Sequence, residues 1–234
     1  MITMRPAAER GHANHGWLDA NFTFSFANYY DPAWMGFRAL RVINDDIVAP
    51  GRGFGKHPHD NMEILTYMIS GSLGHNDSTG GSGAITPGEL QHMSAGTGIF
   101  HSEQNASQTE ESHSLQIWIQ PNRRNVKPVY NQRRFRVAEE PNKFHLLASG
   151  GNTAGRDDSF AMYADADLFA AVIEPGATVT HTFGKPYGWL HVVRGEVNLS
   201  GAKLKAGDGV ALSNEEAITL TTPTGGEVLL FDLD

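Results

Sequence analysis

The sequence predicts an all-β protein, and two observations carry this prediction. The chain of 234 residues contains 26 glycines and 11 prolines, spread along its length as in proteins with many tight turns. Between these turn signals lie short segments rich in β-branched and aromatic residues, while helical periodicity is weak everywhere. This pattern is typical of an antiparallel sandwich or barrel.

The expected strands follow one another at short intervals. In the first part of the chain they are residues 22–27, 37–43, 63–69, 114–119 and 144–148. Further along they are residues 170–173, 189–193, 197–200, 217–221 and 228–231. Turn dipeptides such as Pro50-Gly51 and Pro87-Gly88 separate them.

A faint internal repeat indicates two similar halves. LTYMISGSLGHN followed by TPGEL resembles WLHVVRGEVNLS followed by KAGDG. Alignment of Gly71 with Gly195 superimposes the first turns and places His57 on His181. The repeat favours two stacked barrels over a chance likeness of two hairpins, and residues 121–158 would connect them.

Composition and charge exclude several classes of protein. The formal net charge is −8, which repels phosphate backbones. The basic cluster of the chain consists of Arg123, Arg124, Arg133, Arg134 and Arg136. We interpret this cluster as a solvated face around the connecting segment, so direct nucleic-acid binding is not expected.

Targeting signals and thiol chemistry are also missing from the sequence. The chain contains no cysteine, which excludes disulfides, thiolate metal ligands and thiol nucleophiles. The stretch MITMRPAAERGHANHG is polar and lacks the apolar core of a signal peptide. Without a run of about 20 apolar residues, a transmembrane helix is not expected either. We therefore expect a soluble cytoplasmic protein.

Two short segments repeat one spacing of metal-binding residue types. GKHPHDNMEIL contains His57 and His59, and GIFHSEQN contains His101 and Glu103. Residues two apart on a strand point to the same face. If the two strands face each other inside a barrel, three imidazoles and one carboxylate converge on one point.

This donor set has a defined chemistry. Imidazoles with a carboxylate suit Fe, Zn, Ni, Cu or Mn better than Ca or Mg, and they leave positions open for water or substrate. A single pair of this kind is more often part of a surface loop. Two pairs, each beside glycine-rich turns, favour a metal site.

Other histidines carry weaker signals. His12 and His15 are three residues apart without an evident helix to align them, and we interpret them as hydrogen-bonding groups that hold the N-terminal segment. We interpret His75, His92 and His113 as surface or strand-packing residues, although His92 lies close to the second pair.

The motifs around the two pairs resemble those of a known family. HPHDNME fits the first motif of the cupin superfamily, and PGELQHMSAGTGIFHSE fits the second. More narrowly, these motifs resemble the pirin family, together with LQIWIQP after them and RGHANHGWLDANFTFSFANYYDP near the start. The likeness is strong over residues 10–135 and thin afterwards. It is closest to bacterial pirin-like proteins described as quercetin dioxygenases.

For the fold, the resemblance implies a bicupin of two stacked antiparallel jelly-roll β-barrels. Residues 1–132 would form a metal-binding cupin barrel. Residues 133–234 would form a degenerate cupin barrel without metal, and the chain would be a monomer.

For the site, the resemblance implies one divalent transition metal held by His57, His59, His101 and Glu103. Iron is expected first, with manganese, zinc, nickel, copper or cobalt as alternatives. Glu63 belongs to the first cupin motif and is a ligand in many cupins, but here we expect it to orient the ligands from outside.

For the activity, the resemblance implies a metal-dependent flavonol dioxygenase similar to quercetin 2,3-dioxygenase, with 2,4-cleavage of the ring and release of carbon monoxide. The flavonol would bind the metal through its 3-hydroxyl oxygen, and Glu103 would accept the proton as general base. Phe54, Met62 and Phe100 are candidates for the apolar walls or for the core.

Two other functions fit the same motifs. Eukaryotic pirins are associated with transcription-factor binding, so the protein would then be a metal-dependent, redox-sensing co-regulator with a protein partner. A zinc hydrolase or an isomerase could also use the cupin scaffold, because fold does not fix chemistry.

Overall fold

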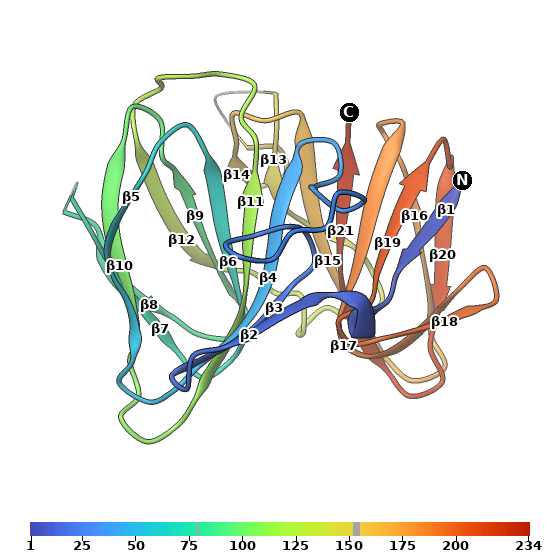
Figure 1. The fold of residues 1–234 in the computed structure, drawn as a ribbon. Helices are drawn as coiled ribbons and strands as arrows, with labels where there is room; N and C mark the ends of the chain where they lie inside the picture. The colour runs from blue at the N-terminus through green and yellow to red at the C-terminus, as the bar shows by residue number, and fades with distance from the viewer. Residues whose placement is uncertain (79, 152–154) are drawn as a thin grey trace. The chain divides into compact units, whose positions relative to one another are not determined.

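The computed structural model describes residues 1–78, 80–151 and 155–234, and its regular structure is almost entirely β-strand (Figure 1). Within this described part the only helical element is the 3-10 helix η1 (Ala7–Glu9). None of the described residues form a helix long and apolar enough to cross a membrane. The prediction of an all-β chain is confirmed. The chain divides into two compact units.

The first unit, which we call the first barrel, comprises Gly11–Gly36 and Leu40–Phe135. It has a sheet in the order β12-β9-β6-β11-β4-β3-β2 and a smaller sheet in the order β5-β10-β7-β8. The larger sheet contains β2 (Gly11–Asn14), β3 (Leu18–Phe22), β4 (Leu40–Val48), β6 (Glu63–Ser70), β9 (Glu89–Ser94), β11 (Ser112–Ile119) and β12 (Val129–Arg134). The smaller sheet contains β5 (Gly53–His59), β7 (Leu73–Asp77), β8 (Ser82–Ile85) and β10 (Ile99–Asn105).

The second unit, the second barrel, comprises Met1–Arg10, Phe37–Ala39 and Arg136–Asp234. Its main path of strands runs in the order β1-β19-β17-β21-β15-β13-β14. Off this path, β18 and β20 each pair with β17, and β16 pairs with β20. The main path contains β1 (Ile2–Arg5), β13 (His145–Ser149), β14 (Phe160–Ala161), β15 (Ala166–Ile173), β17 (Tyr187–Leu199), β19 (Gly209–Ser213) and β21 (Gly226–Leu233). The other strands are β16 (Thr178–Thr182), β18 (Ala202–Lys205) and β20 (Ala217–Thr221).

The two barrels share one topology. The order β12-β9-β6-β11-β4 in the first corresponds to β1-β19-β17-β21-β15 in the second, and the pair β5-β10 corresponds to β16-β20. The turn glycines correspond as well. Gly71 has φ 72° and Gly195 has φ 71°, a left-handed conformation that glycine adopts without strain. The expected repeat is thus present in three dimensions, and the two-barrel cupin fold is confirmed.

The strand β1 belongs to the second barrel. It pairs with β19 in antiparallel register, from Ile2 opposite Leu212 to Arg5 opposite Gly209, and Figure 1 shows the blue β1 beside the orange β19. β1 takes the edge position that β12 takes in the first barrel. A compact unit is not necessarily a domain that folds by itself. The division into domains 1–132 and 133–234 therefore stays a prediction.

Two expected strands are displaced. β3 ends at Phe22, and residues 23–25 are irregular. Residues 26–29 then form a turn that a bridge between Phe26 and Tyr29 closes, with Ala27 at φ 50°. The aromatic residues there signal packing rather than a strand, because the rings of Phe22 and Phe26 lie 5.6 Å apart. The strand expected over residues 37–43 begins at Leu40 and continues to Val48.

The expected connection over residues 121–158 contains regular structure. β12 lies within it and pairs with β9 in the first barrel. β13 also lies within it and pairs with β15 in the second barrel. Asn131, Arg133 and Arg134 of this segment therefore lie in a strand, and of these three Arg134 is exposed.

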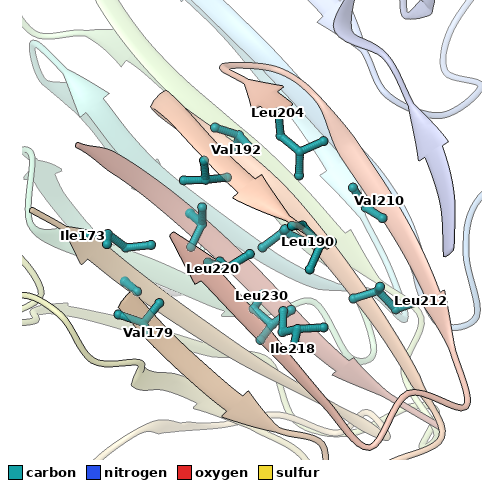
Figure 2. Packing of buried hydrophobic residues seen from close by; sticks show 14 residues of the cluster. Ile173, Val179, Leu190, Val192, Leu204, Val210, Leu212, Ile218, Leu220 and Leu230 are labelled. Atoms are coloured by element: carbon teal, nitrogen blue, oxygen red, sulfur yellow. The ribbon is translucent and has the colours of Figure 1, made fainter. Parts of the chain in front are cut away.

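Aliphatic side chains fill the second barrel, and Figure 2 shows them converging from several strands. The buried cluster consists of Ala171, Ile173, Val179, Leu190, Val192, Val197, Leu199, Leu204, Val210, Leu212, Ile218, Leu220, Val228 and Leu230. Alternation on β20 turns Ile218 and Leu220 inward and leaves Thr219 and Thr221 exposed. Burial of each large aliphatic side chain contributes about 1.5–3 kcal/mol, so this barrel has its own stable core.

We expect Leu220→Ala to lower the free energy of unfolding by about 2–5 kcal/mol, because it leaves a cavity in a fully buried cluster. Thr221→Ala, one residue along on the exposed face, should change it by only about 0.5 kcal/mol. Urea denaturation of the two variants measures both values. Equal effects would contradict the assignment of β20's faces.

Candidate metal centre

The two histidine-containing segments form neighbouring strands of the smaller sheet. β5 and β10 pair in antiparallel register, with His59 opposite Ile99 and His57 opposite His101. A bulge follows between His101 and Glu103, so Glu103 lies opposite Phe54. The extra residue lies on β5, where three steps from His57 to Phe54 match two steps on β10. His101 and Glu103 therefore keep the same face of β10.

Gly53 permits the close approach of the two strands at this bulge. A Cβ at Gly53 would lie 2.2 Å from the backbone oxygen of Glu103. No side chain fits at that distance, so glycine is required here.

The structure brings the three predicted imidazoles together. The ring centroids of His57 and His101 lie 4.4 Å apart, and that of His59 lies 4.8 Å from each of them. One nitrogen of each ring lies within 4.8 Å of a nitrogen of the other two. This spacing fits a single ion held between the three side chains.

Glu103 lies beside the same cluster, together with a histidine that the sequence did not single out. One ligand atom from each of His75, His101 and Glu103 lies within 4.8 Å of the others. The amide of Gln116 donates to both carboxylate oxygens of Glu103, at 3.3 and 3.1 Å. Glu103 is therefore buried and held in one orientation.

His75 is 2% exposed and lies on β7, opposite Glu103 of β10. The assignment of His75 to the surface or to strand packing missed its contact with His101, since the two Nδ1 atoms lie 3.3 Å apart. A signal was present, because His75 and Asp77 repeat the i, i+2 spacing of the predicted pairs.

Hydrogen bonding leaves nitrogen atoms available for a metal. The Nδ1 of His57 lies 2.8 Å from the carbonyl oxygen of Gly55, so Nδ1 carries the proton and Nε2 has a free lone pair. The Nε2 of His101 is buried and has no hydrogen-bond partner. A buried imidazole nitrogen without a partner is the atom that a metal ligand requires, so the residues fit a bound metal.

Burial and neighbouring groups lower the pKa values of His59 and His101, which keeps these two imidazoles neutral. Burial, followed by the charge of His57, lowers the pKa of His59 to about 4. Burial, followed by His57, His59 and His75, lowers the pKa of His101 to about 3. Neutral imidazole is the form that binds metals.

The pKa values of two buried carboxyl groups, Glu103 and Asp46, are raised instead of lowered. Burial raises the pKa of Glu103 to about 7, although the hydrogen bond from Gln116 opposes the rise. Burial, followed by the charges of Asp45 and Glu103, raises the pKa of Asp46 to about 8.

Glu63 lies in neither of the described groups that could hold a metal. Its two carboxylate oxygens bind His92 Nε2 at 2.7 Å and Ser94 Oγ at 2.6 Å. Both partners lie on β9, so the contacts of Glu63 belong to the larger sheet. An orienting role of Glu63 toward the ligands stays a prediction without support from these contacts.

His181 marks the corresponding place in the second barrel. It lies on β16 opposite Ile218, where the first barrel pairs His57 with His101. The ring of His181 is surrounded by Phe144, Phe169 and Phe183, with centroids 5.3, 4.6 and 5.0 Å away. Among the described residues, every group with metal-binding geometry lies in the first barrel.

A pocket of about 420 Å³ opens beside the cluster in the first barrel. Its lining consists of Trp17, Phe26, Asn44, Asp46, Gly53, Phe54, Gly55, His57, His59, Glu103, Gln116 and Trp118. Four aromatic side chains provide flat apolar walls, and polar groups gather near the imidazoles. Such a lining is typical of a small-molecule site.

The three candidate wall residues have different positions. Phe54 lines the pocket. Met62 packs against the buried cluster that includes Ile64 and Met93. Phe100 is 49% exposed, so it belongs neither to the core nor to the pocket lining.

Fold and site together define a two-barrel cupin with a cluster of histidines and a carboxylate in one barrel. A family model described as Pirin matches residues 3–119, and one described as Quercetinase C-terminal cupin domain matches residues 146–233. The chain belongs to the pirin family.

Relatives cover the full length of the chain. It is 48% identical to a quercetin 2,3-dioxygenase of Escherichia coli (strain K12) over 100% of this chain and 99% of that protein. It is 40% identical to a pirin-like protein of Caulobacter vibrioides over 99% of each. The structure of the bacterial pirin YhhW of Escherichia coli in complex with nickel(II) has a TM-score of 0.92 at 47% identity, covering 100% of this chain and 99% of that chain.

We expect the metal-free protein to lose stability as the pH rises from about 7 to about 8. In this window the native protein keeps protons on Glu103 and Asp46 that the unfolded chain has released, because both folded pKa values are raised. The lowered pKa values of His59 and His101 act mainly below this window, because above pH about 7 the unfolded chain has lost most of its histidine protons as well. Each carboxyl can contribute up to about 1.4 kcal/mol per pH unit.

Asp46→Asn removes one of the two titrating carboxyl groups with little change of shape. We therefore expect the free energy of unfolding of this variant to fall less steeply with rising pH. Urea denaturation of chelator-treated protein at several pH values in this window measures the slope. Glu111→Gln, an exposed carboxyl in the same barrel, should leave the slope unchanged. A slope that is the same in wild type and Asp46→Asn would show that Asp46 is ionised in the folded protein.

Proposed function

We propose that this protein is a metal-dependent dioxygenase that cleaves flavonols such as quercetin with dioxygen. One observation carries the proposal: three imidazoles and a held carboxylate gather at a pocket with aromatic walls. The names of relatives support it, since a quercetin 2,3-dioxygenase is 48% identical over the whole chain. The cytoplasmic location and the monomeric state expected from the sequence stay predictions.

His57, His59, His101 and Glu103 would hold the metal. The nickel(II) complex of the similar pirin YhhW supports a divalent transition metal here, and the donor set also suits iron, the metal that we expected first. When bound, such a metal supplies Lewis acidity toward a coordinated hydroxyl and a site for oxygen chemistry.

The pocket would bind a flat substrate through its walls. Trp17, Phe54 and Trp118 offer apolar faces, and Trp17 meets Phe54 edge to face at 5.2 Å between ring centroids. Contacts of this kind orient an aromatic ring system and exclude water from the reacting end.

Glu103 would accept the proton of the substrate's 3-hydroxyl. Its carboxylate lines the pocket beside His57 and His59. The amide of Gln116 fixes the carboxylate plane, and the hydroxyl of Thr66 in turn binds the Gln116 oxygen at 3.2 Å. The base is thus presented in one orientation, which general base catalysis requires.

We expect His101→Ala to remove most of the bound metal, because His101 belongs to both described groups of ligand atoms. Inductively coupled plasma mass spectrometry of protein purified without added metal measures the content. The same variant should unfold at a lower temperature than the metal-loaded wild type, since a metal bound only to the folded state stabilises it.

His181→Ala provides the matched control, because His181 occupies the corresponding place in the second barrel and lies among phenylalanines. Its metal content should equal that of the wild type. If this substitution empties the protein of metal, the assignment of the site to the first barrel is wrong.

We expect Glu103→Gln to lower flavonol turnover by roughly 100- to 10,000-fold, because the amide has the size of the carboxylate but cannot act as a base. The assay measures carbon monoxide and loss of flavonol absorbance with metal-reconstituted protein, quercetin and oxygen. Glu110→Gln, an exposed position, serves as control.

One result of the same assay would favour a binding protein instead. If turnover is slow and His59→Ala leaves it unchanged, the ring cleavage does not depend on the cluster. The protein would then be better described as a metal-dependent binding module.

A further inference from the structure

A buried chain of polar side chains reaches His101 from the side of β7. His75 and Asp77 have side chains that are 1% and 0% exposed. Asp77 Oδ2 lies 3.0 Å from His75 Nε2, and His75 Nδ1 lies 3.3 Å from His101 Nδ1. The His75 ring stacks on Tyr130 at 4.6 Å between centroids and 19° between planes, which fixes its orientation.

The direction of the hydrogen bonds follows from Asp77. Its Oδ1 accepts the backbone N–H of Gly81 at 3.1 Å, and an ionised carboxylate can only accept hydrogen bonds. His75 Nε2 is therefore the donor to Asp77, which leaves a lone pair on His75 Nδ1. That lone pair accepts the Nδ1–H of His101.

We propose that Asp77 and His75 are positioning residues that fix the tautomer and the ring orientation of His101, so that its Nε2 presents a lone pair to the metal. This role rests on the proposed function only through the assignment of His101 as a ligand. An imidazole ligand that donates its second N–H to a partner gains a fixed tautomer and a higher basicity.

An alternative role for His75 is direct metal binding, because its ligand atom lies within 4.8 Å of those of His101 and Glu103. The hydrogen bonds favour the positioning role. Both nitrogens of His75 have partners within the protein, whereas His101 Nε2 has none and is buried.

The tautomers can be observed directly in the metal-free wild type. Full-length protein labelled with nitrogen-15 histidine, treated with chelator and studied by long-range proton–nitrogen correlation, distinguishes Nδ1–H from Nε2–H rings. We expect His101 as the Nδ1–H form and His75 as the Nε2–H form. His101 in the Nε2–H form would overturn the proposal.

Asp77→Asn reverses the direction of the hydrogen bonds that run from residue 77 through His75 to His101, with little change of shape. The Gly81 N–H holds the amide oxygen, so the amide nitrogen faces His75 and donates to it. His75 then donates to His101 Nδ1, and the proton of His101 moves to Nε2. A substitution of this kind in a carboxylate–histidine pair selects the wrong tautomer without moving the atoms.

Nickel(II) affinity of the chelator-treated variants, measured by competition with a chromogenic chelator, gives the second readout. We expect Asp77→Asn and His75→Phe to weaken binding by roughly 10- to 100-fold. His75→Asn keeps an acceptor near the position of Nδ1 and should recover most of the affinity. Asp45→Asn, which alters an Asp–His pair with His113 in the same barrel, should bind nickel as the wild type does.

Unchanged affinity in Asp77→Asn would overturn the proposal, and so would loss of one histidine ligand from the nickel X-ray absorption spectrum of His75→Asn. If Asp77→Asn does not fold, the tautomers of the wild type decide. Neither readout uses a flavonol, so a protein with the expected tautomers and affinities but without turnover would contradict the proposed function alone.

Discussion

The pairing of β5 with β10 is the constraint on which the candidate site depends. It sets His57 directly opposite His101, and the two-residue period of β10 turns Glu103 toward the same pocket. A slip of one residue would send these side chains to the opposite face of the sheet. Gly53 makes this register possible, because any side chain at that position would collide with the neighbouring strand.

The second barrel shows that the fold itself needs no such cluster. β16 and β20 repeat the pairing of β5 and β10, yet Ile218 stands where the first barrel has a histidine. His181 remains, enclosed by aromatic rings. At this pair of strands, one topology thus carries an aliphatic side chain in one copy and a cluster of histidines in the other. This is expected when function resides in side chains grafted on a common scaffold.

Local spacing explains what the sequence predicted well. His57 and His59 share a strand face by the two-residue period, and His101 joins them because the strands pair. Local spacing does not predict contacts between side chains on different strands, because these depend on which strands pair and in which register. His75 meets His101 only through the register of β7 with β10, and Glu63 binds His92 only through the register of β6 with β9. Aromatic content also misled over residues 23–27, which pack their side chains without forming a strand. Side-chain burial does not require a ladder of backbone hydrogen bonds.

The position of β1 bears on how the chain assembles during synthesis. β1 lies near the start of the sequence, but its partner β19 comes from residues 209–213. Nearly all the residues of the first barrel lie between them. Since segments emerge from the ribosome in order, the first barrel can close while β1 still lacks its neighbour. β1 is thus made before the first barrel but finds its partner only after residues 209–213 have emerged.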